Sequence, residues 1–208
     1  MSSDQASYLV ARTTISVEYA ALMGNGHCPL GMYVIPSPDN LFVWDVVFFV
    51  HQGYYAGAIL KFRVTFPENY PEGPPSVRFV TEVFHPLISQ DGDFALDWRF
   101  RPWRPKEHHI FDILHSIKSA FKMETLDKLR GEDCINKEAF RYKESAQSFA
   151  SLATQSVHLS ESESALFDRD HHNRNRGTPH SLQFQKINSE QMRQVNEKLG
   201  LQPPGTKA

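Results

Sequence analysis

The thiols and imidazoles of this 208-residue chain, which could act as nucleophiles or zinc ligands, belong to two cysteines, Cys28 and Cys134, and ten histidines. A catalytic thiolate needs a nearby cation or a helix N-terminus to lower its pKa, but Cys134 follows Asp133, whose carboxylate acts in the opposite direction. Zinc needs four converging ligands, and the pairs His108–His109 and His171–His172 lie far from both cysteines in sequence. The cysteines also lack CxxC spacing and predict reduced thiols in a cytosolic protein. We therefore expect structural thiols, no metal site and no cofactor.

The charge balance argues against two classes of partner. The chain has 22 Lys and Arg against 24 Asp and Glu, a net charge of −2, which indicates no basic surface for nucleic acid or an anionic membrane. The longest apolar run, residues 41–50, is too short to cross a bilayer and contains Asp45. The N-terminus has no basic region before an apolar stretch, so it does not predict a secretory signal. We expect a cytoplasmic globular protein without direct membrane insertion.

Composition divides the chain into three parts. Residues 1–157 alternate apolar segments with turn signals and predict one folded domain that is large enough to bury a core. Residues 158–186 contain few apolar side chains, as in the stretches SESES and RDHHNRNRG, and predict a flexible polar linker. Residues 187–208 predict a C-terminal helix and tail.

The pattern within residues 1–157 predicts the α+β class. A helix over residues 4–23 is followed by four runs rich in β-branched and aromatic residues, whose short connections favour an antiparallel meander. In the third run apolar residues alternate with Lys61, Arg63 and Thr65, which predicts one buried face and one solvent-exposed face. Later helices are expected to pack on one face of the sheet. The expected strands are 31–36, 41–50, 59–66 and 76–81, and the expected later helices are 107–122 and 136–157.

Several motifs in this domain occur in the order and spacing of a known family. They are DNLFVW at 39–44, FPENYPEGPPSVRF at 66–79, FHPLISQDGDFALD at 84–97, and Trp103 with Pro105. Together they resemble the ubiquitin-conjugating family. This resemblance implies a ubiquitin-conjugating-enzyme-like fold with an N-terminal helix, a four-stranded antiparallel meander and C-terminal helices.

The same resemblance implies that the family's catalytic groups are absent. Conjugating enzymes carry ubiquitin as a thioester on a cysteine, and the asparagine of a His-Pro-Asn motif stabilises the oxyanion. Here Ala95 occupies the cysteine position and the motif reads His85, Pro86, Leu87. A methyl group cannot carry an acyl group, and leucine donates no hydrogen bond. We expect a protein that is not an enzyme, in which His85 braces its loop through hydrogen bonds.

The departures from the enzyme pattern are similar to those of the fused-toes proteins, also called AKT-interacting proteins, which lack the cysteine. The similar segments are VEYA at 17–20, GMYVIPS at 31–37, FHPL at 84–87, WR at 103–104 and HHI at 108–110. This resemblance implies a complex with a Hook-type coiled-coil protein and a Hook-interacting protein, which links dynein to endosomal and other vesicular cargo. Active members place several basic residues on the first helix to dock the activating enzyme, whereas Arg12 is the only one within residues 1–30 here.

Two other functions stay open at this stage. A variant that binds ubiquitin or assists an active conjugating enzyme would also lack the cysteine, although such variants commonly lack the last helices, here expected within 136–157. The other open function is an active conjugating enzyme with a displaced nucleophile, such as Cys134. Capture of Hook proteins, of ubiquitin with a conjugating enzyme, or of activating enzyme from cell extract would separate the three.

Residues 188–200 predict an amphipathic helix. Asn188 and Gln191 have the spacing of a capping box, and Gly200 supplies a stop. Because so short a helix is marginal in water, its apolar stripe is expected to pack on its own domain or along a partner's helix, for example at the end of a Hook coiled coil. The predicted stripe consists of Met192, Val195 and Leu199, and the predicted surface ion pair of Arg193 and Glu197.

Overall fold

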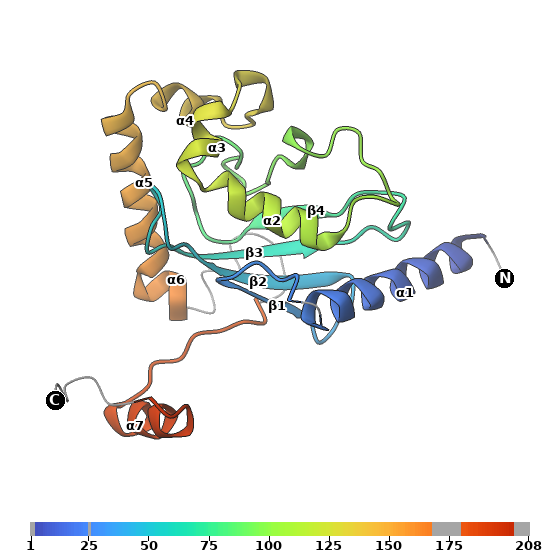
Figure 1. Ribbon diagram of the computed structural model, residues 1–208, viewed down its shortest axis with the longest axis horizontal. Coiled ribbons are helices and arrows are strands. Elements are labelled where there is room, and N and C mark those ends of the chain that lie inside the picture. The colour runs from blue at the N-terminus through green and yellow to red at the C-terminus, as the bar shows by residue number, and fades with distance from the viewer. Residues whose placement is uncertain (1–2, 25, 168–179, 202–208) are drawn as a thin grey trace.

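The computed structural model describes residues 3–24, 26–167 and 180–201 (Figure 1). A long helix, α1 (Ser3–Gly24), precedes four antiparallel strands in the order β1-β2-β3-β4, and further helices follow. The predicted α+β class and the antiparallel meander are therefore confirmed. The strands are β1 (Met32–Pro36), β2 (Val43–Phe49), β3 (Ile59–Thr65) and β4 (Ser76–Phe79), and the later α-helices are α2 (Ile110–Ala120), α3 (Met123–Lys128), α4 (Lys137–Tyr142), α5 (Ala146–Glu161), α6 (Glu163–Phe167) and α7 (Ser189–Lys198).

One face of the sheet, here called the inner face, forms the hydrophobic core with α2. Trp44 of β2 and Phe62 of β3 are fully buried, and the rings of Phe62 and Phe79 lie 5.0 Å apart between centroids. Helix α2 covers this face, because its apolar residues recur at spacings of three and four and are buried together (Figure 1). The central inner-face residues of β2 and β3 are Trp44, Val46, Phe48, Leu60, Phe62 and Val64.

A buried carboxylate joins α1 to the start of α2. Glu18 is 7% exposed, and its Oε1 accepts a hydrogen bond from the Tyr70 hydroxyl at 2.9 Å. The same oxygen lies 3.0 Å from Nδ1 of His109, and Oε2 accepts from the backbone N–H of Ile110 at 3.3 Å. The positive end of the α2 dipole also favours this negative charge. Glu18 therefore fixes the position of α1 against the rest of the domain.

The single helix predicted over 136–157 is wrong, because the chain forms two helices there, α4 and α5. They are separated at residues 143–145, where Ser145 takes an extended backbone conformation and begins α5. The Lys143 ammonium donates to three carbonyl oxygens at the C-terminal end of α3. This long-range contact holds the end of α4 against α3, and local periodicity contains no sign of it.

The opposite face of the sheet, here called the outer face, is polar and buried, so the predicted solvent-exposed face of β3 is wrong at its centre. Lys61 is 2% exposed and Asp45 is fully buried. The Lys61 ammonium donates to the carbonyl oxygens of Ala165 at 2.9 Å and Leu166 at 3.1 Å, in α6. Arg63 Nε donates to Asp45 Oδ1 at 2.8 Å. The alternation in β3 could not reveal this cover, which lies 104 residues further along the chain.

Residues 180–184, here called the strap, lie across the same outer face. His180 is 1% exposed, and its Nε2 lies 3.3 Å from the carbonyl oxygen of Phe62 and 3.7 Å from Asp45 Oδ1. The backbone N–H of Ser181 donates to Asp45 Oδ2 at 2.7 Å, and the ring of Phe184 contacts the Lys61 ammonium. The strap therefore supplies partners to the polar groups that it buries.

These contacts correct the predicted flexible linker over 158–186 wherever the structure describes it. Residues 158–161 complete α5, α6 follows, and the strap packs on the sheet, while residues 168–179 lie outside the described residues. Composition was misleading here because this segment packs on the sheet mainly through polar groups: backbone carbonyls of α6 accept from Lys61, and His180 and the Ser181 N–H meet Asp45.

Helix α7 lies apart from the sheet (Figure 1), and none of its residues is buried. The predicted capping box is confirmed: Asn188 Oδ1 accepts from the N–H of Gln191, and Gln191 Oε1 accepts from the N–H of Asn188. Arg193 pairs with Glu190 at 2.9 Å instead of the predicted Glu197, because its side chain points toward the N-terminal turn of α7, where Glu190 lies three residues away. The end of the predicted tail, residues 202–208, lies outside the described residues.

Candidate functional site

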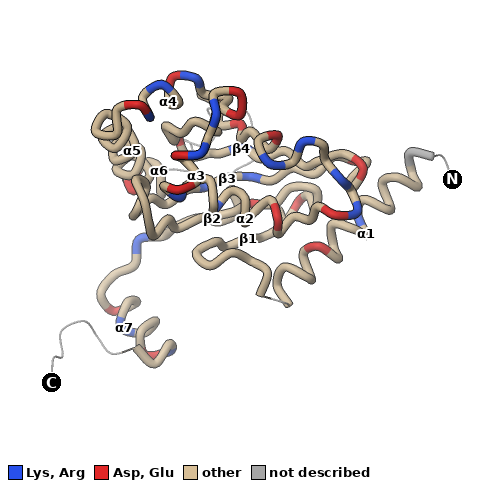
Figure 2. Tube along the Cα trace, turned by 45° about the horizontal axis from the view of Figure 1, so that its top comes forward, with Lys and Arg blue, Asp and Glu red and all other residues tan. Residues whose placement is uncertain are grey.

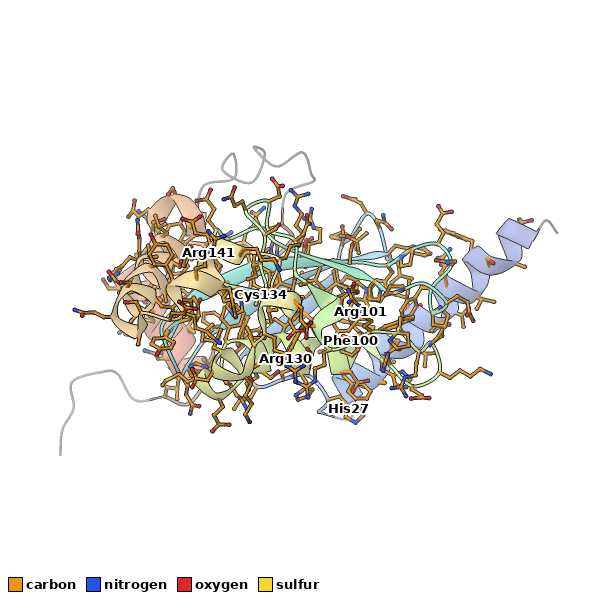
Figure 3. All side chains as sticks on the ribbon, turned by 90° about the horizontal axis from the view of Figure 1, so that it is seen from above. His27, Phe100, Arg101, Arg130, Cys134 and Arg141 are labelled. Atoms are coloured by element: carbon orange, nitrogen blue, oxygen red, sulfur yellow. The ribbon has the colours of Figure 1, made fainter. Side chains whose placement is uncertain are left out.

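A groove of about 560 Å³ lies where the motif segments meet. Its walls come from residues 74–77, where the proline-rich loop ends and β4 begins, the segment 93–98, the loop 100–103 and residues 132–135. Figure 3 labels three of the lining residues, Phe100, Arg101 and Cys134. The indole N–H of Trp103 donates to the carbonyl oxygen of Pro71 at 2.8 Å, so the proline-rich loop and the Trp-x-Pro motif form one wall together.

His85 holds the loop beside the groove in the way that the sequence predicts. Its side chain is fully buried, Nδ1 accepts from the N–H of Leu87 at 3.0 Å, and Nε2 donates to the carbonyl oxygen of Ala120 at 3.1 Å. Burial lowers the pKa of His85 to about 4, although the bond to Ala120 acts in the opposite direction, so the imidazole is neutral at pH 7. Pro86 is also buried, and its carbonyl oxygen accepts from the N–H of Asn136 at 3.0 Å.

Leu87 and Ala95 lie next to each other, joined by a bond from the N–H of Ala95 to the carbonyl oxygen of Leu87 at 2.9 Å. The Leu87 side chain reaches neither the solvent nor the groove: it is 0% exposed and belongs to the hydrophobic core. Ala95 is partly buried and lines the groove with a methyl group. At these two positions the groove therefore presents neither a nucleophile nor a side-chain hydrogen-bond donor.

Cys134 is the one thiol among the groove-lining residues. It is 3% exposed, and its Sγ donates to the carbonyl oxygen of Arg130 at 3.2 Å. Burial raises the pKa of Cys134 to about 11, with a further contribution from the carboxylate of Asp133. The group is thus a protonated thiol at pH 7, and the thiolate is the nucleophilic form. These properties agree with the sequence interpretation of a structural thiol.

Two of the similar segments meet in space, which sequence reasoning did not predict. Glu18 belongs to VEYA and His109 to HHI, and the two side chains are in hydrogen-bonding contact. Their separation of 91 residues hides the pair. The only available signal was an acidic residue on an otherwise apolar and uncharged turn of the first helix.

The three residues of the predicted partner stripe are far from this groove in the fold, on α7. Met192, Val195 and Leu199 are 46%, 42% and 65% exposed, and they share one side of the helix. The structure brings the degenerate catalytic positions together but does not join them to this stripe.

Residues 3–24, 26–167 and 180–201 offer neither a clustered set of metal ligands nor a membrane-spanning helix. Within these ranges, His, Cys, Asp and Glu side chains form no group of three or more arranged to hold a metal ion. Within the same ranges no helix combines the length and the apolar character needed to cross a bilayer.

Comparison with known proteins gives the following matches. The profile of the family described as ubiquitin-conjugating enzyme matches residues 16–157. The AKT-interacting protein of Danio rerio is 33% identical over 172 residues, which cover 81% of this chain and 55% of that protein. The AKTIP homolog of Nematostella vectensis is 28% identical over 174 residues, covering 81% and 54%. The crossbronx homolog of Culex quinquefasciatus is 38% identical over 94 residues, covering 44% and 41%. The chain spans about half the length of the curated relatives that it matches.

Proposed function

The chain belongs to the ubiquitin-conjugating enzyme family, and from this premise we propose that it is a non-catalytic adaptor. In this proposal it is the fused-toes subunit of a complex with a Hook-type coiled-coil protein and a Hook-interacting protein, which links dynein to endosomal or vesicular cargo. It works in the cytoplasm and reaches endosomes or vesicles through these partners. The similarity to AKT-interacting proteins supports the assignment.

The observation that carries the absence of catalysis is the pair Ala95 and Leu87. Ubiquitin transfer requires a thiolate that accepts the acyl group and a donor that stabilises the oxyanion. Ala95 offers a methyl group to the groove, and the Leu87 side chain is buried in the core. The nearby thiol, Cys134, has a pKa raised to about 11, so it does not replace the missing nucleophile.

Helix α7 supports the adaptor half of the proposal. Its apolar stripe of Met192, Val195 and Leu199 is exposed among the described residues, and an isolated helix of this length is marginal in water. An amphipathic helix of this kind binds by placing its apolar side against a groove or a partner helix. We assign the stripe to the Hook-type coiled coil.

The central experiment measures binding of the full chain to the purified coiled coil of a Hook-type protein. Met192→Asp with Leu199→Asp should weaken binding at least tenfold, which corresponds to about 1.4 kcal/mol. Because both side chains are exposed, the thermal midpoint should stay unchanged. Arg193→Asp changes the net charge by the same amount outside the stripe and should bind normally. A lowered midpoint with intact binding would mean that α7 serves its own domain.

A second experiment tests the absence of catalysis. The chain, mixed with activating enzyme, ubiquitin and ATP, should form no adduct that a reducing agent removes on a gel. Ala95→Cys should still transfer ubiquitin to lysine near background, because Leu87 supplies no oxyanion donor and the first helix is nearly free of basic residues. Robust lysine modification by Ala95→Cys would show that the other departures do not matter. Capture of ubiquitin with a conjugating enzyme, without Hook, would favour the ubiquitin-binding alternative.

A further inference from the structure

The two sides of helix α1 differ in burial. One side is buried against the domain through Ala11, Ile15, Glu18 and Leu22. The opposite side is exposed along the helix, and it includes apolar residues large enough to matter for binding. The described part of the chain therefore covers only half of α1.

The exposed side carries a regular heptad pattern, here called the α1 seam. Its residues follow one another at alternating intervals of four and three, which is the spacing of the a and d positions of a coiled coil. Valines occupy the central a positions and are 57% and 62% exposed. Leu9 and Met23, at flanking positions, are 45% and 59% exposed and widen the apolar surface. The α1 seam consists of Ala6, Val10, Thr13, Val17, Ala20 and Gly24.

The α1 seam is free of charge. The charged residues of α1 are Asp4, Arg12 and Glu18, and none of them occupies a seam position. In Figure 2 the tube of α1 is mostly tan. The seam has one hydroxyl, on Thr13, and it is satisfied within the helix, since Oγ1 donates to the carbonyl oxygen of Leu9 at 2.9 Å. A partner surface that complements the α1 seam is therefore apolar and uncharged, and it needs no hydrogen-bonding groups.

We propose that the α1 seam binds one helix of the coiled-coil partner, as a second contact beside α7. The identity of that partner rests on the proposed function, whereas the kind of occupant rests on α1 itself. A partner helix fits because heptad spacing keeps one stripe in register with another helix over the whole length of the seam, about 27 Å at 1.5 Å per residue. Charge complementarity then requires a partner stripe without charges.

The side-chain sizes favour a different protein over a second copy of this chain. The d positions Ala6, Thr13 and Ala20 are small, and Gly24 adds no side chain at all. In a parallel pair of seams these small residues would face each other, and in an antiparallel pair they would face the seam valines or Gly24. Either pairing lacks the bulky side chains that fill a helix interface and would leave voids. A partner helix with bulky aliphatic residues, such as Leu or Ile, fills these positions. The occupant is therefore a helix with large apolar side chains in an uncharged heptad stripe.

The test uses the full chain with Val10→Glu and Val17→Glu together, and the coiled coil of a Hook-type protein as probe. Binding should weaken at least tenfold, while the thermal midpoint stays within a degree or two of the unmodified protein, because both positions are exposed and glutamate favours helix. Arg12→Glu is the matched control, since it changes the charge by the same amount on the same helix but outside the seam. Equal binding by the unmodified protein and the double variant would overturn the proposal.

Two further measurements separate the remaining outcomes. If sedimentation shows a dimer that Val10→Glu with Val17→Glu dissociates, the seam joins two copies and the proposal is wrong. If the unmodified protein does not bind Hook, the proposed function fails. The seam is then tested with a designed helix that has Ile at its a positions, Leu at its d positions and uncharged flanking residues. Binding of that helix, lost in the double variant, would support the seam as a helix receptor; no binding would overturn it.

Discussion

The two faces of the central sheet are built from alternate residues of the same strands, yet they are buried by different means. The inner face presents Phe62 and its neighbours to α2 and forms an apolar core. The outer face presents Asp45 and Lys61, which are equally inaccessible but are covered by α6 and the strap. Burial on the inner face removes apolar surface from water, whereas burial on the outer face exchanges water for specific hydrogen bonds.

This difference predicts how each face responds to change. Apolar burial is nearly independent of pH, and its loss leaves a cavity whose cost depends on volume. A buried charge is stable only while its partners and its protonation state are kept. The outer face should therefore be sensitive to pH and to changes in the strap, and the inner face to the size of its side chains.

The largest effect is expected from truncation on the inner face. Phe62→Ala should lower the free energy of unfolding by about 3–5 kcal/mol, because the ring is fully buried and packs against Phe79. Thr65→Ala, at the exposed end of the same strand, should change it by less than about 0.5 kcal/mol. Denaturant unfolding measures both, and a loss below about 1 kcal/mol for Phe62→Ala would contradict the description of this face.

Acid should destabilise the fold through His85, a buried polar side chain beside the apolar core. The pKa of His85 is lowered by burial from 6.5 to about 4, so the unfolded chain binds more protons between these values. Stability is present above pH 6.5 and falls as the pH drops toward 4, by about 3 kcal/mol for this group. Urea titrations at pH 7 and pH 4 should show a smaller difference in His85→Gln by about that amount. An unchanged difference would mean that His85 is not buried in its neutral form.

On the outer face, alkaline pH should stabilise the fold through Lys61. Burial lowers the pKa of Lys61 from 10.5 to about 8, so raising the pH removes a charge that the folded state disfavours. Between pH 7.5 and 9.5 the free energy of unfolding should rise by about 2 kcal/mol relative to Lys61→Met. Parallel pH dependence in the two proteins would show that the Lys61 ammonium reaches water.

The smallest expected effect is a coupling between the sheet and the strap. Asp45→Ala and His180→Ala should be non-additive by about 1 kcal/mol, because the Asp45 carboxylate and the His180 imidazole lie 3.7 Å apart in a buried site. Asp45→Ala with Met192→Ala should instead be additive, since α7 lies apart from the sheet. Additivity in the first pair would place the strap away from β2.

Much of the fold followed from local patterns. The strands were predictable because their β-branched and aromatic runs are bounded by turn residues. Helix α7 was predictable because Asn188 and Gln191 form hydrogen bonds with each other's backbone within its first turn. The cover of Lys61 and the break before Ser145 were not predictable, because their partners lie far away in sequence. The alternation along β3 reports which residues share a face, and not what lies over that face.

The candidate site was predictable in its chemistry but not in its geometry. The motif order placed Ala95 and Leu87 at the two key positions, and the Asp133 carboxylate next to Cys134 gave the direction of its pKa shift. The bond between Ala95 and Leu87, and the contact of Glu18 with His109, needed the folded chain. The exposed α1 seam is also a finding of the structure, because only burial distinguishes it from the opposite side of the same helix.

In the proposed complex the strap also determines how strongly the α1 seam and α7 can act together. It holds the chain at the Phe184 ring, and Lys186 pairs with Glu163 of α6, so only residues 187–188 separate the last of these contacts from α7. These residues form a tether that spans at most about 7 Å when fully extended. If the α1 seam and α7 bind the same partner, as proposed, the tether holds α7 at a high effective concentration near that partner, provided that it spans the distance between the two sites. Lengthening it would lower the avidity of the pair without altering a single contact.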